Sequence, residues 1–205
     1  MRRDDVNSTI IRRCQRGDIR ALETIYRTYS KRVYRLCLRM AGDTGIAEDL
    51  LQEVFIRAYE QIGKYSGRAS FSTWLYRVAT NHCLNVLKSQ RQLPSLEGLP
   101  DNTLPSDPSP SPLARSIDEE EFRLALRLLE QLGPDERAIL VLREIEGLSY
   151  RQISFVLDIA AGTVMSRLHR ARQCLEELAH PDGLFLAESR IKEDDGLSKS
   201  SGVSE

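Results

Sequence analysis

The sequence is poor in aromatic residues and cysteine, and it has no long apolar run. Aromatic residues make up 6% of the 205 positions, and the four cysteines lie far apart with no C-x-x-C pair. This spacing argues against a secreted disulfide framework and against a zinc site. No stretch reaches the roughly eighteen apolar residues of a membrane span, and the charged amino terminus does not resemble a secretory signal. We therefore expect a cytoplasmic protein without metal, cofactor or membrane span of its own.

The chain also lacks an excess of charge of one sign. It has 29 Lys+Arg against 30 Asp+Glu, a formal net charge of −1. The charges are unevenly distributed, because residues 1–93 contain 17 basic and 9 acidic side chains and the remainder is acidic. Since a near-neutral sum hides a basic amino-terminal half, it does not exclude nucleic acid as a partner.

Proline is concentrated in one segment. Six of the eight prolines lie between Pro94 and Pro112, separated mainly by small polar residues. Each proline fixes φ and disfavours a helical predecessor, so this segment is typical of an extended linker. We predict a domain at 1–93, a flexible Pro/Ser-rich linker at 94–116, a second domain at 117–179 and an acidic, Ser-rich tail at 180–205.

Apolar residues on both sides of the linker recur at helical spacing. In the first domain the pattern predicts helices over about 22–40, 46–62 and 71–91. In the second it predicts helices over about 122–132, 134–145 and 150–157, and a last one after Gly162. No convincing alternating strand is present. The fold class is therefore all-α, with two small helical domains.

The second domain contains the pattern of a helix-turn-helix. Ser149 and Gln152 have the spacing of a capping box, and a tight turn over 158–162 precedes a longer helix. The second helix of this motif enters the DNA major groove, where an arginine directed at guanine contributes about 1–3 kcal/mol of discrimination. An ordinary solvated helix face remains the alternative for its outward arginines. The motif alone leaves many classes of regulator open.

The first domain carries two further patterns. Asp49, Gln52, Glu53 and Arg57 share one helix face at spacings of three and four, and such a face suits a basic coiled coil, although an ordinary solvated face fits the pattern too. Residues 64–72 and the following helix combine basic, small polar and aromatic groups, which suits melted single strands held by charge and stacking. Aromatic residues at helical spacing also fit a core, and the pattern alone does not separate the two roles.

Taken together, these features resemble the extracytoplasmic-function group of bacterial sigma factors. The resemblance covers residues 15–178. Residues 47–58 resemble region 2.2, residues 73–81 the "TWL-R-A-N" signature of regions 2.3 and 2.4, and residues 142–172 region 4.2. The motifs stand in the family's order, on either side of a linker.

The resemblance implies a dissociable specificity subunit of RNA polymerase with no catalytic chemistry of its own. In this family, region 2 docks on the clamp helices of the largest subunit and recognises and melts the −10 promoter element. Region 4 binds the flap of the second-largest subunit and reads the −35 element as duplex. Most members are held inactive by an anti-sigma factor, so we expect core polymerase, promoter DNA and an anti-sigma factor as partners.

The resemblance assigns three sets of site residues. The core-polymerase set is Asp49, Gln52, Glu53 and Arg57. The −10 set is Lys64, Tyr65, Ser66, Arg68, Phe71, Ser72, Trp74, Arg77, Asn81, Lys88 and Arg91. The −35 set is Arg143, Tyr150, Thr163, Ser166, Arg167, His169 and Arg170. Met165 departs from the basic residue that many members carry there, which puts the usual −35 preference in doubt.

Two other classes of function compete with this interpretation. A stand-alone helix-turn-helix regulator would use the first domain to sense a ligand, but it would not need the polar face at 48–57. An enzyme is the weakest alternative, because the sequence has no G-x-x-x-x-G-K, G-x-S-x-G or H-E-x-x-H motif. Promoter-specific transcription that depends on added core polymerase would separate the first class from a sigma factor.

Overall fold

The computed structural model describes residues 6–92 and 117–179, and every regular element in these two ranges is helical. The first unit consists of α1 (Ser8–Gln15), α2 (Ile19–Ala41), α3 (Thr44–Gln61), the 3₁₀ turn η1 (Ile62–Lys64) and α4 (Phe71–Gln92). The second consists of α5 (Ile117–Gln131), α6 (Pro134–Leu140), the π-helical turn η2 (Val141–Ile145), α7 (Tyr150–Leu157) and α8 (Ala161–Ala179). The all-α prediction is confirmed, whereas the predicted linker and tail lie outside the described residues.

The ends of the long helices follow from local side-chain chemistry. Asp18 precedes α2 and accepts hydrogen bonds from the amides of Arg20 and Ala21. At the other end, Gly42 adopts φ +81°, the left-handed conformation that terminates a helix and favours glycine. Asp43 then accepts from the amide of Ile46 at 2.8 Å and begins α3. None of the helices in the described ranges is both long and apolar enough to cross a membrane.

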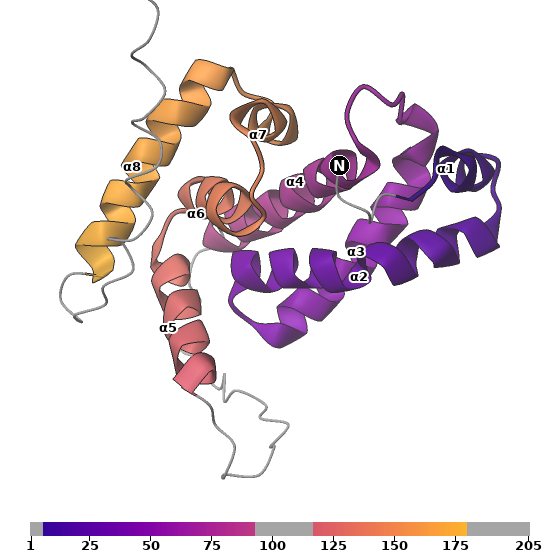
Figure 1. The fold of residues 1–205 in the computed structure, drawn as a ribbon. Coiled ribbons are helices and arrows are strands. Elements are labelled where there is room, and N and C mark those ends of the chain that lie inside the picture. Colours follow the sequence, from indigo (N-terminus) through magenta and orange to yellow (C-terminus); the bar gives the residue numbers. More distant parts are fainter. Residues whose placement is uncertain (1–5, 93–116, 180–205) are drawn as a thin grey trace, which may run out of the picture.

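The core of the first unit lies between α2, α3 and α4, which pack against one another as Figure 1 shows. Tyr29, Leu36, Met40 and Leu75 are among its fully buried side chains. Helical spacing over residues 22–40 places Tyr26 on the same face of α2 as the buried Tyr29 and Val33, but Tyr26 is 41% exposed. Helix α1 was not predicted, because it is short and buries few side chains amid charged neighbours.

The second unit departs from prediction at three places. Its first helix, expected over about 122–132, begins at Ile117. The helix expected over 134–145 is α-helical only as far as Leu140 and then widens into the π turn η2. The apolar spacing predicts that both Leu142 and Ile145 are buried; Leu142 is buried, but Ile145 is 42% exposed, so that part of the prediction is wrong. The last helix begins at Ala161 rather than after Gly162.

The two units pack directly against each other, which the sequence did not predict. Helix α4 contacts α6 and α7, while α2 contacts α5 and α6. Figure 1 shows α8 on the side of the second unit away from α4. The contact surface between the two units therefore includes part of α4, the helix expected to contact the −10 element. Helix α8 lies outside this contact surface.

Candidate nucleic-acid and polymerase interfaces

Helix α3 presents a polar face to solvent, which we call the α3 face: Asp49, Gln52, Glu53, Ile56 and Arg57. All five side chains are exposed, and the opposite side of the helix is buried through Leu50, Val54 and Ala58. Ile56 was not expected in this set, yet it is 60% exposed in the middle of the face. An apolar side chain surrounded by polar ones is a common arrangement in protein–protein interfaces.

A buried histidine supports the α3 face from beneath. His82 of α4 is 5% exposed, and its Nε2 lies 2.7 Å from a carboxylate oxygen of Glu53. Burial lowers the pKa of His82, and Arg57 lowers it further, whereas Glu53 acts in the opposite direction. His82 therefore lies beside Glu53 mainly as a neutral side chain. No local sequence pattern predicts this contact between two helices.

The loop between η1 and α4 is held by hydrogen bonds from within the first unit. The side-chain amide of Gln15 donates to the carbonyl oxygens of Ile62 and Tyr65, both at 3.0 Å. The hydroxyl of Tyr65 donates to the carbonyl of Ala69 at 2.9 Å. Lys64, Ser66 and Arg68, all exposed, lie in this braced loop. The loop thus presents basic and hydroxyl groups from a fixed backbone.

Aromatic rings pack beneath the loop rather than on its surface. Phe71 lies 5.6 Å from the ring of Tyr29 and about as far from Tyr65 and Trp74. Because Phe71 is only 2% exposed, its ring is part of the core and has no free face for a base in this structure. Trp74 is half-buried beside Tyr65, with ring centroids 5.5 Å apart. The expectation that Phe71 contacts DNA therefore needs correction, while Trp74 retains a partly accessible ring.

Two basic residues of α4, Arg77 and Lys88, contact the second unit. Arg77 donates to the carbonyl oxygen of Phe155 at 3.0 Å, and its guanidinium lies 5.0 Å from the centre of that ring. A second nitrogen of Arg77 is 3.3 Å from the carboxylate of Asp158. Lys88 pairs with Asp135 at 2.9 Å. Two cationic side chains that were expected to contact DNA thus form hydrogen bonds or ion pairs with α6, α7 and the turn that follows α7.

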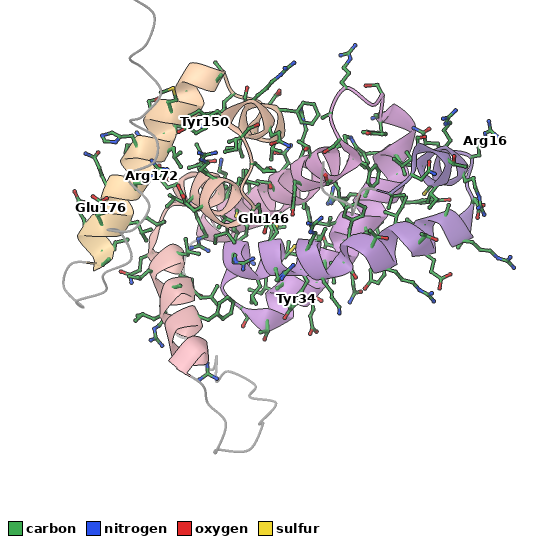
Figure 2. All side chains as sticks on the ribbon, in the orientation of Figure 1. Arg16, Tyr34, Glu146, Tyr150, Arg172 and Glu176 are labelled. Carbon is green, nitrogen blue, oxygen red and sulfur yellow. The ribbon has the colours of Figure 1, made fainter. Side chains whose placement is uncertain are left out.

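Glu146, labelled in Figure 2, forms a largely buried polar contact between the units. It accepts a short hydrogen bond from the hydroxyl of Tyr76, and its other oxygen lies 3.6 Å from Arg39. Burial raises the pKa of Tyr76, as does the neighbouring carboxylate, so the phenol stays protonated and donates. The π turn η2 directly precedes Glu146, and the backbone amide of Glu146 donates a hydrogen bond to the carbonyl oxygen of Val141.

Helices α7 and α8 have the geometry of a helix-turn-helix. Ser149 and Gln152 form the predicted capping box, in which each side chain bonds the backbone of the other. At the end of α7, Asp158 adopts φ +56°, and the amide of Ile159 bonds the carbonyl of Ser154 at 3.2 Å. Val164, Leu168 and Ala171 are buried, so the opposite side of α8 faces solvent.

The arginines around α8 differ in how far they are engaged. Arg170 donates to Glu136 at 3.2 Å, and Arg172, labelled in Figure 2, pairs with Glu144 at 2.7 Å. Arg143 lies 4.9 Å from the ring centre of Tyr150 and donates to a backbone carbonyl. Arg167 is exposed and has no ion pair within the described residues.

Comparison with known proteins decides which family the chain belongs to. The Sigma-70 region 2 model matches residues 25–92, and the Sigma-70, region 4 model matches residues 122–175. The RNA polymerase sigma-H factor of Pseudomonas aeruginosa is 35% identical over 84% of this chain and 93% of its own length. The ECF RNA polymerase sigma factor SigW of Bacillus subtilis is 34% identical over 82% of this chain and 93% of its own length.

The chain belongs to the extracytoplasmic-function sigma factors. Two solved structures share the fold of this sigma factor. CnrH, in complex with the cytosolic domain of CnrY, superimposes with a TM-score of 0.63 at 18% identity, over 85% of this chain and 97% of that one. The sigma factor RpoE of Bartonella quintana, in complex with the anti-sigma factor NepR, gives 0.60 at 22% identity, over 78% and 97%.

The structure sorts the predicted site residues of this sigma factor into three groups. Exposed and available are the α3 face, the loop cations and, in α8, Ser166, Arg167 and His169. Contacting the other unit or a neighbouring carboxylate are Arg77, Lys88 and Arg170. Ser72, Asn81, Tyr150 and Thr163 are half-buried, and the side chain of Arg91 lies outside the described residues. Gln15, Ile56, His82 and Glu146 were not among the predicted site residues.

Proposed function

We propose that this sigma factor binds core RNA polymerase through the α3 face, holds the −10 element with residues 64–72 and α4, and reads the −35 element with α7 and α8. The observation that carries this division is that the α3 face and the outer face of α8 are both exposed and stand on separate helical units. We propose that these units belong to the domains at 1–93 and 117–179, with residues 94–116 as the linker.

The chemistry of the α3 face suits a basic helical partner. Glu53 and Asp49 supply negative charge, Gln52 offers an amide, and Ile56 supplies an apolar contact between them. Such a centre, desolvated on binding and surrounded by charges, provides both affinity and orientation. The clamp helices of the largest polymerase subunit are the partner that the family resemblance implies.

The −10 function requires the two units to separate. Arg77 is bonded to α7 and to the turn after it, and the half-exposed Lys88 is paired with Asp135 of α6, so both side chains are engaged while the units are packed. We infer that the free protein binds a −10 strand weakly and that core polymerase, by engaging the units separately, holds them apart. The α8 face does not require this change.

Three further properties belong to this proposal. A factor acting on RNA polymerase works in the cytoplasm, and promoter opening uses binding energy alone, so we propose no catalytic chemistry for this chain. An anti-sigma partner is proposed as well, in keeping with the family. A stand-alone helix-turn-helix regulator is not favoured, because the region 2 match covers most of α2 and all of α3 and α4.

Charge reversal on the α3 face tests core binding. Glu53→Arg should reduce capture of core RNA polymerase at least tenfold, because a like charge would then meet a basic partner. Glu23→Arg is a matched control, since the two carboxylates have similar exposure (52% and 56%) and Glu23 lies on α2. Run-off transcription from a promoter selected with the wild-type holoenzyme should fall in parallel.

Folding of both variants is checked by thermal denaturation, since Glu53→Arg also removes the contact with His82. A folded Glu53→Arg protein that captures core as well as the wild type would refute the docking face. Tight, specific duplex binding by the free wild-type protein without any stimulation of core polymerase would refute the sigma-factor activity as a whole.

A further inference from the structure

Met165 is an exposed apolar side chain on the recognition helix. It is 58% exposed, while the apolar side chains next to it in α8, Val164 and Leu168, are at most 1% exposed. A single exposed apolar residue is ordinary on a protein surface. Whether the exposure of Met165 indicates a function therefore depends on its position in the helix-turn-helix and on the residues around it.

Met165 lies on the part of α8 that enters the major groove in this motif. The helix begins at Ala161, and successive residues turn by about 100°. Met165, Ser166 and His169 therefore share one exposed side, away from the buried Val164 and Leu168. In a helix-turn-helix the residues near the start of the second helix contact base edges. Met165 belongs to this group by position.

The hydrogen-bonding capacity of this side is limited. The hydroxyl of Ser166 donates to the carbonyl of Thr163 at 3.2 Å, so its oxygen remains mainly as an acceptor. Arg170 and Arg172 are held by Glu136 and Glu144. Met165 itself offers a thioether, which is at best a weak acceptor. Arg167 and His169 remain for polar contacts, whereas the position of Met165 offers an apolar contact and no strong hydrogen bond.

Among the base edges exposed in the major groove, the 5-methyl group of thymine is the apolar one. We propose that Met165 reads a thymine methyl group in the −35 element and so acts as a specificity-determining residue. The inference rests on the proposed function of α8. Burial of one methyl group against Met165 should strengthen binding about fourfold relative to the same base pair without it.

Replacement of single thymines by deoxyuridine tests this directly, because it removes the methyl group and leaves base pairing intact. The holoenzyme of this sigma factor and bacterial core polymerase first selects promoter duplexes from a library randomised across the −35 element. Each thymine of the enriched element is then replaced in turn, and the dissociation constant is measured. One replacement should weaken wild-type binding about fourfold and leave the binding of Met165→Ala unchanged.

Arg167→Ala is the matched control on the same helix. Its loss of charge should weaken all duplexes while preserving the ratio between thymine and deoxyuridine. The proposal is overturned if the enriched element has no thymine, if no replacement affects the wild type, or if Met165→Ala keeps the full deoxyuridine effect. A failure of the proposed function would look different, because the library would then show no −35 enrichment at all.

Discussion

Loss of the Glu146 charge should open the packed arrangement of the two units. Glu146→Gln retains an acceptor for the Tyr76 hydroxyl but removes the negative partner of Arg39, whose side chain is only 18% exposed. Hydrogen bonds to charged groups contribute about 1.5–3 kcal/mol and neutral ones about 0.5–1.5 kcal/mol. With the lost ion pair added, the packed state should be destabilised by about 2 kcal/mol. The ratio of packed to separated molecules should then fall about 30-fold.

Fluorescence energy transfer between labels at Gln61 and Gln173 would measure this equilibrium. Both side chains are exposed, and they lie on α3 and α8, one in each unit. Glu146→Gln should shift the distance distribution toward longer values and strengthen binding of the free protein to a single-stranded −10 oligonucleotide, because Arg77 becomes available. Secondary structure should remain unchanged by circular dichroism.

Lys88→Met provides the comparison for an exposed pair. Lys88 and Asp135 are 47% and 45% exposed, and such pairs contribute about 0–1 kcal/mol. This variant should change the distance distribution much less than Glu146→Gln. If Glu146→Gln leaves both the distances and the oligonucleotide affinity as in the wild type, the buried contact does not control separation of the units.

Two further predictions concern stability. Gly42→Ala should destabilise the protein by at least about 1–2 kcal/mol in urea denaturation, because φ is +81° there and the added Cβ would also displace the side chain of Glu130. Gly63→Ala, at a site with open space for a Cβ, should be nearly neutral, and equal losses in both would contradict the strain at Gly42. Since burial lowers the pKa of His82, the unfolded state should bind a proton first as pH falls below about 6.5. The free energy of unfolding should therefore decrease toward pH 5, and a profile that His82→Gln does not flatten would assign the decrease to other groups.

Periodicity predicted most of the long helices because their cores are built locally. Apolar residues three and four apart place one face of α2, α3 or α4 inward, and the pattern is visible without tertiary information. Helix α1 was not predicted because its buried residues, Ile11 and Cys14, lie among charged side chains and form no clear apolar periodicity. The stability of α1 depends on packing and on Gln15, whose side-chain amide donates hydrogen bonds to carbonyl oxygens 47 and 50 residues away in the sequence.

The packing of the two units was beyond prediction for a related reason. Its contacts join polar groups far apart in sequence, such as Arg77 with the carbonyl of Phe155, 78 residues away. An arginine on a helix gives the same local pattern whether it meets a phosphate, a carbonyl or water. Phe71 illustrates the converse limit, since its spacing fitted a core and a stacking surface equally well, and only its burial distinguishes them.

The carboxylates beside α8 bear on how salt affects duplex binding. Each phosphate neutralised by a cation releases counterions and adds roughly 0.9 to the slope of log K against log salt concentration. An arginine that stays beside a glutamate brings little net charge to the DNA. Arg170 and Arg172 have such partners in Glu136 and Glu144, whereas Arg167 has none in the described residues. Counterion release by the recognition helix should thus be smaller than its number of arginines suggests, which leaves a larger share of the −35 affinity to contacts that salt does not weaken.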